Sequence, residues 1–437
     1  MSTPQSKSAV RQSPGCNCVH RDRAIAGGAN LPGFVAHPAG SVTEPGQQPK
    51  PPSPRRPLDG LSIPVKDNID VAGWPTRAGS LATPTTPSAT DAAAVASLRR
   101  AGADVSMKTT LDEFAFTTSG PGMVNPYDPS RTVGGSSGGA ALAVASGRYC
   151  VAVGTDTGGS VRIPASYCGV VGFKPSYGAV PVDGVIPLSW SLDHVGFLGC
   201  GVRMIATVFD ACRTTRPLHR PATPTRRRYW PRHLGELRIG VPDADYLSHA
   251  TPPVLEALTR TAAALSAAGV EIKNTYLPDV RRVLRSHYAI AAAEAATYHS
   301  GQYEGLSRHG AEARAVIETG LQMGAGSYIS ALRERERLKL EFAALLDEID
   351  LVLLPTTPTT APLVTDTSMT LGTGETVDRL DGSIWYTALF NDLGAPAITV
   401  PLRGDGLPVG IQLAAAQGED DLLLAAAARV EEIIEAL

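Results

Sequence analysis

The chain has 437 residues, of which 43% are hydrophobic and 19% are charged, and its formal net charge at pH 7 is −3. This balance predicts a globular protein with a large core, and it argues against nucleic acid as the main partner because phosphate binding requires concentrated positive charge. The 6 cysteines are widely spaced and show no disulfide framework.

Two segments differ from the rest of the chain. Residues 1–57 are rich in proline and glycine, which predicts an irregular N-terminal segment, and Cys16, Cys18 and His20 within it form too small a ligand set for a metal site. The basic segment 213–233 is interrupted by prolines, which favours a solvated linker loop over a nucleic-acid site. Because neither a secretory signal nor a run of 18 apolar residues is visible, we expect a cytoplasmic protein.

The remaining residues, 58–437, alternate short apolar runs with amphipathic stretches. In chain order, the pattern predicts strand 61–65, helix 91–102, strand 103–108, helix 136–147, strand 149–156, strand 237–242, helix 253–268, strand 270–277, helix 327–348, strand 349–355, strand 395–401, strand 409–415 and helix 419–436. Such alternation predicts the α/β class, with a mixed, twisted central sheet covered by helices on both faces. We expect one large domain.

Two glycine-rich stretches, GGSSG (134–138) and DTGGS (156–160), carry candidate nucleophiles. The first matches the G-x-S-x-G nucleophile elbow, but a loop with two prolines precedes it where an elbow requires a strand. The second matches one half of an aspartic-protease site, but a second such motif is missing. A phosphate cradle is disfavoured because the P-loop lysine is absent. A plain glycine turn that lets a strand and a helix pack closely stays open.

Lys66 follows the first predicted strand in the stretch SIPVKDN. A lysine can act as a general base when burial lowers its pKa from about 10.4 toward neutrality. Glycine turns supply clustered backbone N–H groups, which can stabilise the oxyanion that forms during acyl transfer. The lysine, the serines and the glycine turns together therefore favour acyl-transfer chemistry over a purely structural role.

The stretches LDGLSIPVKDNIDVAGWPTRAGS, VGGSSGGAALAVASG, VGTDTGGSVRIPASYCGVVGFKPSYG and FNDLGAPAITVP resemble the amidase signature family of Ser–Ser–Lys hydrolases. The resemblance runs from about residue 58 to the C-terminus. It implies Ser160 as the nucleophile, Lys66 as the base and Ser136 as the relay between them. It also implies a cis peptide between Gly135 and Ser136, and a mechanism that requires no metal or organic cofactor.

The same resemblance implies roles for the residues around these three. The oxyanion hole is expected at Thr157, Gly158, Gly159 and Ser160. Residues expected to hold the turn are Gly135, Ser137, Asp156 and Arg162. Ser166, by contrast, is expected to be structural.

The implied function is hydrolysis of a small-molecule carboxamide to the acid and ammonia or an amine, by a homodimer with no nucleic-acid or membrane partner. Two alternatives share the fold: the glutamine-hydrolysing subunit of a tRNA-dependent amidotransferase, and an amide-forming acyltransferase. Substrate contacts are expected within 110–130, 185–200, 295–330 and 370–390. Aromatic candidates for the pocket are Tyr298, Tyr303, Trp385 and Tyr386.

Overall fold

The computed structural model of the protein describes residues 33–35, 56–214, 234–404 and 406–437. Most of the N-terminal segment, nearly all of the basic segment 213–233, and the Cys16, Cys18 and His20 group lie outside these residues. No helix in the described ranges is both long and apolar enough to cross a membrane.

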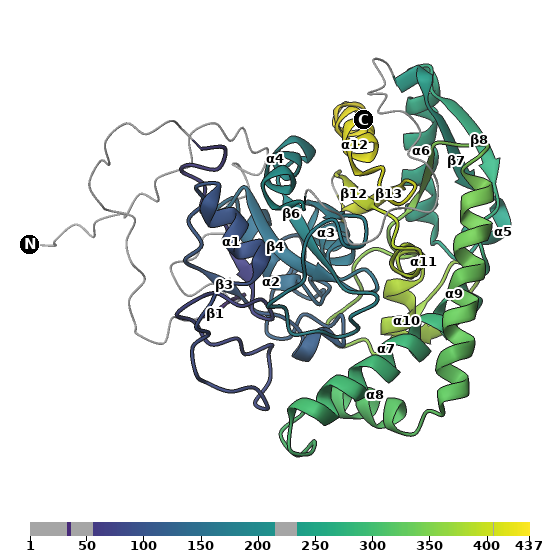
Figure 1. Cartoon of the computed structure of the whole chain (residues 1–437). Helices are drawn as coiled ribbons and strands as arrows, with labels where there is room; N and C mark the ends of the chain where they lie inside the picture. Colours follow the sequence, from purple (N-terminus) through teal and green to yellow (C-terminus); the bar gives the residue numbers. More distant parts are fainter. Residues whose placement is uncertain (1–32, 36–55, 215–233, 405) are drawn as a thin grey trace, which may run out of the picture.

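The secondary structure follows the chain from a two-residue edge strand to a C-terminal helix (Figure 1). The strands are β1 Phe34–Val35, β2 Val65–Lys66, β3 Lys108–Thr109, β4 Val151–Asp156, β5 Val171–Lys174, β6 His194–Gly199, β7 Arg238–Pro242, β8 Glu271–Thr275, β9 Leu351–Pro355, β10 Ser368–Thr370, β11 Thr376–Asp378, β12 Ala397–Leu402 and β13 Val409–Ala414. The helices are α1 Ala93–Arg100, α2 Gly138–Ala145, α3 Arg162–Cys168, α4 Val202–Cys212, α5 Ala244–Leu247, α6 Pro252–Ala267, α7 Val280–Gln302, α8 Ala311–Leu321, α9 Ala325–Leu345, α10 Arg379–Ile384, α11 Ala388–Asp392 and α12 Asp420–Ile434. Two short 3₁₀ turns span Glu113–Ala115 and Leu234–Glu236.

A single 11-stranded sheet crosses the molecule in the order β1-β3-β2-β4-β6-β5-β12-β13-β9-β7-β8. Strands β3, β2 and β4 are parallel, as are β9, β7 and β8, whereas the strands between β4 and β9 pair in antiparallel fashion. The central strands are buried along their whole length because helices cover both faces, and they are accordingly apolar runs rather than alternating ones.

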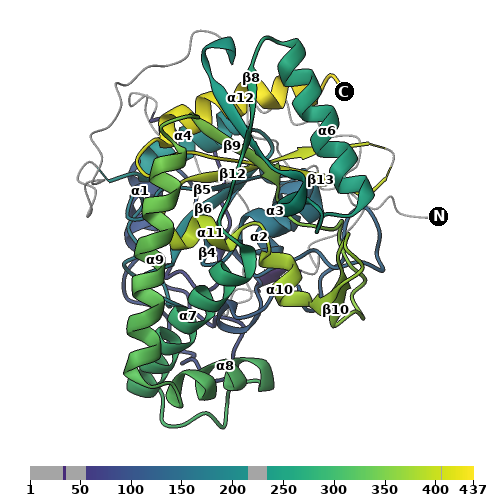
Figure 2. The same ribbon diagram turned by 90° about the vertical axis from the view of Figure 1, so that its right-hand side faces the viewer.

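Helices α2 and α3 pack on one face of the sheet, and α1, α4, α6 and α12 form the layer on the other face. Helices α8 and α9 both pack on α7 at one end of the molecule, and α11 also lies against α7 (Figures 1 and 2). Through α7, this third group of helices reaches the turn where β4 passes into α3.

The predicted α/β class, with a mixed sheet between helical layers, is confirmed. Two details differ. Phe34 and Val35, within the stretch expected to be irregular, pair with β3 as an edge strand. Asp91, the first residue of the helix expected at 91–102, lies before α1, which begins after Ala92. Its carboxylate accepts hydrogen bonds from the Ala72 amide and the Arg99 guanidinium.

A buried ion pair connects the end of β4 with α3. Asp156 and Arg162 are fully buried, and their closest N–O distance is 2.9 Å. Burial alone would raise the pKa of Asp156, but the charge and hydrogen bonds of the Arg162 guanidinium outweigh it and hold that pKa well below its usual range. Arg162 also donates to Asn391 at 2.5 Å, to Gln412 at 2.7 Å and to the Thr387 carbonyl at 3.0 Å. One guanidinium thus ties β4, α3, α11 and β13 together.

We expect Arg162→Met to destabilise the protein by about 3–5 kcal/mol, because the Asp156 carboxylate would stay buried without its counter-charge. Urea unfolding compares this variant with Arg203→Met, which removes an exposed ion pair to Glu432 and should cost less than about 1 kcal/mol. The double variant Asp156→Asn/Arg162→Met should recover part of the loss. Equal costs for the buried and the exposed pair would contradict this role.

Candidate active site

Lys66 ends β2 inside the molecule, with no exposed surface. Its Nζ donates hydrogen bonds to Ser136 Oγ at 2.7 Å and to Thr155 Oγ1 at 2.8 Å. Burial lowers the pKa of Lys66 from 10.5 to about 7, although the carboxylates of Asp112, Asp156 and Asp193 act in the opposite direction. A large fraction of this amine is therefore neutral near pH 7, and a neutral amine can accept a proton.

Ser136 and Ser137 precede α2 and lie against the loop between β4 and α3. The Gly135–Ser136 peptide is cis. The Ser137 amide donates to the Ser160 carbonyl at 3.1 Å, and the Ser137 hydroxyl donates to the Thr155 carbonyl at 3.0 Å. These two bonds hold Ser136 next to the turn that carries Ser160. Gly135 must lack a side chain, because its Cβ would lie 2.1 Å from Asp112 Oδ2.

The turn at residues 156–160 presents backbone amides around Ser160. The Gly159 amide donates to Asp156 Oδ1 at 2.9 Å, so it points into the ion pair. The amides of Thr157, Gly158 and Ser160 donate to no partner in the described part of the chain. Three unengaged N–H groups beside a serine that is 7% exposed can stabilise a developing oxyanion.

A cavity of about 60 Å³ lies beside Ser160. It is lined mainly by apolar and hydroxyl-bearing residues: Ala115, Phe116, Thr117, Thr118, Thr157, Gly158, Ser160, Leu188, His287, Tyr288, Ala291, Val316, Leu380 and Ile384. This lining contains no Lys, Arg, Asp or Glu. Such a wall suits an uncharged group and offers no counter-charge to an ammonium or a carboxylate.

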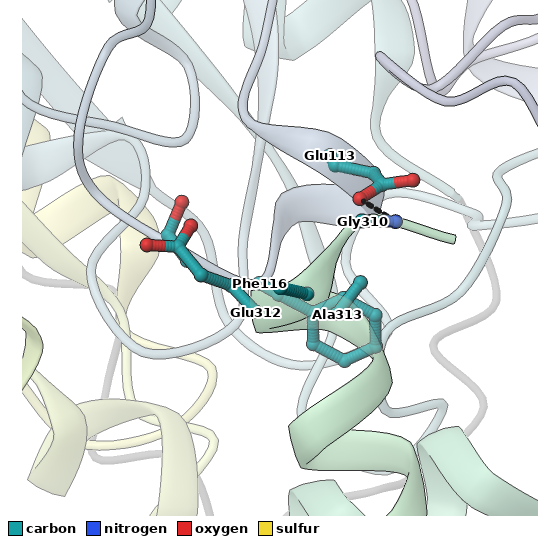
Figure 3. Close-up of a pocket in the computed structure, with 7 residues that line it drawn as sticks. Glu113, Phe116, Gly310, Glu312 and Ala313 are labelled. Carbon is teal, nitrogen blue, oxygen red and sulfur yellow. Dashed lines mark hydrogen bonds between the residues drawn. The ribbon is translucent and has the colours of Figure 1, made fainter. Parts of the chain in front are cut away.

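A second hollow, of about 300 Å³, shares Phe116 and Thr117 with this cavity. Glu113 lies in it, and its carboxylate accepts a hydrogen bond from the Gly310 amide at 2.8 Å (Figure 3). The Glu312 carboxylate points away from Glu113. This second hollow is therefore acidic, whereas the cavity beside Ser160 has an uncharged lining.

Two buried carboxylates that sequence reasoning missed act on Lys66 from a distance. Asp193 accepts hydrogen bonds from Thr157 Oγ1 at 2.6 Å and from the amides of two preceding residues, and burial raises its pKa to about 7. Asp112 accepts from the amides of Ser119 and Gly120, and burial raises its pKa too. Both increase the affinity of Lys66 for its proton.

The structure brings all the residues expected at the site into one region, with differences in detail. The Ser166 hydroxyl accepts the Gly410 amide at 2.9 Å, which agrees with a structural role. Four aromatic candidates, Tyr298, Tyr303, Trp385 and Tyr386, do not line the cavity, and Phe116 and Tyr288 do so instead. The ring of Tyr386 is buried, with its hydroxyl bonded to the Tyr246 carbonyl.

All four expected segments contribute lining residues, but α7 adds His287, Tyr288 and Ala291, which the sequence did not single out. A signal was available there in SHYAIAAAEAATY, where polar residues interrupt an alanine-rich helix. Among the described residues, no group of three or more His, Cys, Asp or Glu is placed to hold a metal ion.

Comparison with known proteins agrees with this geometry. The Amidase family model matches residues 44–424. A glutamyl-tRNA(Gln) amidotransferase subunit of Thermus thermophilus is 36% identical over 411 residues, which cover 87% of this chain and 86% of that protein. A crystal structure of an amidase is 36% identical, covers 86% of this chain and 85% of that one, and has a TM-score of 0.77. The structure of 6-aminohexanoate cyclic dimer hydrolase with substrate is 28% identical and has a TM-score of 0.74. The match covers 86% of this chain and 85% of that one.

These relatives correct the expectation about partners. The sequence predicted a small-molecule amide, a second copy of the chain and no nucleic acid, whereas the curated relatives are subunits of glutamyl-tRNA(Gln) amidotransferases. That expectation is wrong because net charge averages over a whole chain, and a partner subunit can supply the basic surface that tRNA requires.

The resemblance in the motifs is confirmed by a match that spans most of the chain, and the fold agrees with it. The protein therefore belongs to the Amidase family and is an enzyme that acts on amide C–N bonds.

Proposed function

We propose that this chain cleaves the C–N bond of a carboxamide through an acyl-enzyme on Ser160, with Lys66 as the base and Ser136 as the relay. One observation carries the proposal: the buried Lys66 amine, whose pKa is lowered to about 7, lies 2.7 Å from the Ser136 hydroxyl. A structural lysine would pair with a carboxylate, as Lys108 does with Asp67 at 2.6 Å, whereas the side-chain partners of Lys66 are hydroxyl groups.

The proposed reaction moves one proton along the relay in each direction. Neutral Lys66 accepts the proton of Ser136 while Ser136 accepts that of Ser160, and Ser160 Oγ attacks the amide carbon. The oxyanion accepts hydrogen bonds from the unengaged amides of the 157–160 turn. The relay then returns the proton to the leaving nitrogen, and water releases the acyl group by the same route.

For the biological role, the curated relatives favour the glutamine-hydrolysing subunit of a tRNA-dependent amidotransferase. In that role Ser160 would take the glutamyl group of glutamine, and the ammonia would pass to an acceptor held by partner subunits. The role would also place the chain in the cytoplasm, with aminoacyl-tRNA.

One observation favours a second candidate, an amidase for carboxamides with an apolar acyl group. Glutamine carries an α-ammonium and an α-carboxylate, and the cavity beside Ser160 has no charged wall to pair with either. Asp381 on α10 already accepts the hydroxyl of the lining residue Tyr288 at 2.5 Å. Burial of two unpaired charges would oppose glutamine binding.

Ammonia release from L-glutamine and from butanamide, measured side by side with the isolated chain, separates the two candidates. Faster release from glutamine supports the amidotransferase role, and adding the glutamyl-tRNA-binding partners should then raise it further. Faster release from butanamide supports the second candidate. Release from neither substrate, by a chain that still labels at Ser160, would contradict both assignments.

We expect Ser160→Ala to abolish turnover and covalent labelling by a fluorophosphonate probe, because the hydroxyl oxygen forms the acyl bond. Intact-protein mass spectrometry measures the labelling. Ser166→Ala is the matched control, since it removes a nearby hydroxyl that accepts the Gly410 amide. This control should lose about 1 kcal/mol of stability and keep its labelling. Labelling that persists in Ser160→Ala would refute the nucleophile.

The pH dependence tests Lys66. Because the base must be neutral and its pKa is about 7, kcat/KM should rise through pH 7 and level off at alkaline pH. Lys66→Arg should remove the activity, because guanidinium stays protonated.

Asp193→Asn is the control for the identity of the titrating group. Burial raises the pKa of Asp193 to about 7, so this carboxyl group titrates in the same pH range as Lys66. Removing this carboxylate lowers the proton affinity of Lys66, so the rising limb should move to lower pH. The new side-chain oxygen can still accept the amides of Leu188 and Ser189, and its NH₂ group can donate to the Thr157 hydroxyl. Loss of the limb in Asp193→Asn would assign the titration to Asp193 and overturn the role of Lys66.

A further inference from the structure

A histidine–aspartate pair lies at the cavity beside Ser160, with the histidine in the cavity lining. His287 on α7 and Asp392 at the end of α11 lie 2.8 Å apart, Nδ1 to Oδ1, with 5% and 0% of their side chains exposed. The Ser286 hydroxyl donates to the other carboxylate oxygen at 3.2 Å. Because a carboxylate only accepts hydrogen bonds, this geometry places the proton of the neutral imidazole on Nδ1 and leaves a lone pair on Nε2.

Nε2 lies close to the nucleophile turn. A Cβ added to Gly158 would lie 2.8 Å from Nε2, so the imidazole occupies the space above the Gly158 backbone. His287 also lines the cavity together with Ser160. Within the described ranges, Nε2 has no hydrogen-bond partner. A base-type nitrogen without a partner, set in an otherwise uncharged wall, needs a donor from the contents of the cavity.

Helix α11, which holds His287 through Asp392, also holds the turn that carries Ser160. Thr387, directly before α11, donates from its hydroxyl to the Gly158 carbonyl at 2.6 Å. Asn391, next to Asp392, donates to Asp156 Oδ1 at 2.9 Å. The separation of Nε2 from the Ser160 turn is therefore fixed by one rigid element, as a site for an ordered reactant requires.

We propose that His287, held by Asp392, positions the water that hydrolyses the Ser160 acyl-enzyme; this inference rests on the proposed function. One O–H of the water donates to Nε2 and stays bonded to its oxygen. The other gives its proton to the Ser136–Lys66 relay as oxygen bonds to the acyl carbon. The C–Oγ bond then breaks, and the relay returns that proton to Ser160 Oγ. The products are the free acid and the original enzyme.

Two substitutions separate this role from a purely structural one. His287→Asn keeps an N–H near the Nδ1 position, so it can still bond to Asp392, but it removes Nε2. His287→Gln places an amide oxygen near the Nε2 position and gives up the bond to Asp392. His249→Asn is the matched control, since that ring packs on Trp385 outside the cavity lining.

The probe is p-nitrophenyl butyrate, whose good leaving group makes deacylation the slow step. For His287→Asn we expect kcat to fall by about 10²-fold with kcat/KM within about threefold of the wild type, because kcat/KM reports acylation. The burst of nitrophenol should approach one equivalent, and mass spectrometry should find the butyryl-enzyme. His287→Gln should recover part of kcat, and His249→Asn should match the wild type.

The proposal is overturned if His287→Asn leaves kcat unchanged, or if kcat and kcat/KM fall by the same factor without a burst. It is also overturned if only His287→Gln is defective. That variant gives up the bond to Asp392, so the result would mean that His287 acts only through its contact with Asp392. Labelling of Ser160 by the fluorophosphonate probe is read in parallel. If the probe labels Ser160 in the wild type but His287→Asn does not show the expected kinetics, only the role of His287 is rejected. If the probe never labels the wild type, the proposed function itself is rejected.

Discussion

The buried pairing of Asp156 with Arg162 is the constraint on which the rest of the site depends. Both groups are removed from water, and the Arg162 guanidinium keeps the buried Asp156 carboxylate charged. Their hydrogen bonds also determine the shape of the turn, because Asp156 takes the amides of Gly159 and Val161. The remaining amides of the turn are then free to face the cavity. Charge pairing in the core thus decides which backbone groups are available for chemistry.

The same carboxylate helps to set the proton affinity of Lys66. Desolvation lowers the pKa of the amine, and three buried carboxylates raise it, with about 7 as the balance. A deeper apolar environment would leave the amine neutral but weakly basic, and closer carboxylates would keep it charged. Lys108 lies 2.6 Å from the Asp67 carboxylate, which opposes the lowering of the Lys108 pKa by burial. Two buried lysines on neighbouring strands therefore have different partners, a carboxylate for Lys108 and hydroxyl groups for Lys66.

Sequence alone could predict the features that short stretches carry. Lys66, Ser136 and Ser160 stand in motifs of distinctive composition, and strands such as β9 are continuous apolar runs, so both were found. The short helix α3 was missed because Pro164 and neighbouring glycines mask its pattern. The direction of the Gly159 amide was also out of reach, because it depends on where Asp156 points. His287 and Asp392 are 105 residues apart, and no local pattern joins them.

The contacts of Arg162 also bear on the order in which the protein can fold. Its partners Thr387, Asn391 and Gln412 leave the ribosome 225, 229 and 250 residues after Arg162 itself, whereas Lys66, Ser136 and Ser160 leave it before Arg162. Domains fold as units during synthesis, and contacts between distant segments form late. A nascent chain thus carries its reactive serine and lysine before α11 can fix the turn between them. Amide cleavage is in this way deferred until α11 has been synthesised and packed, and this helix also brings Asp392 to His287.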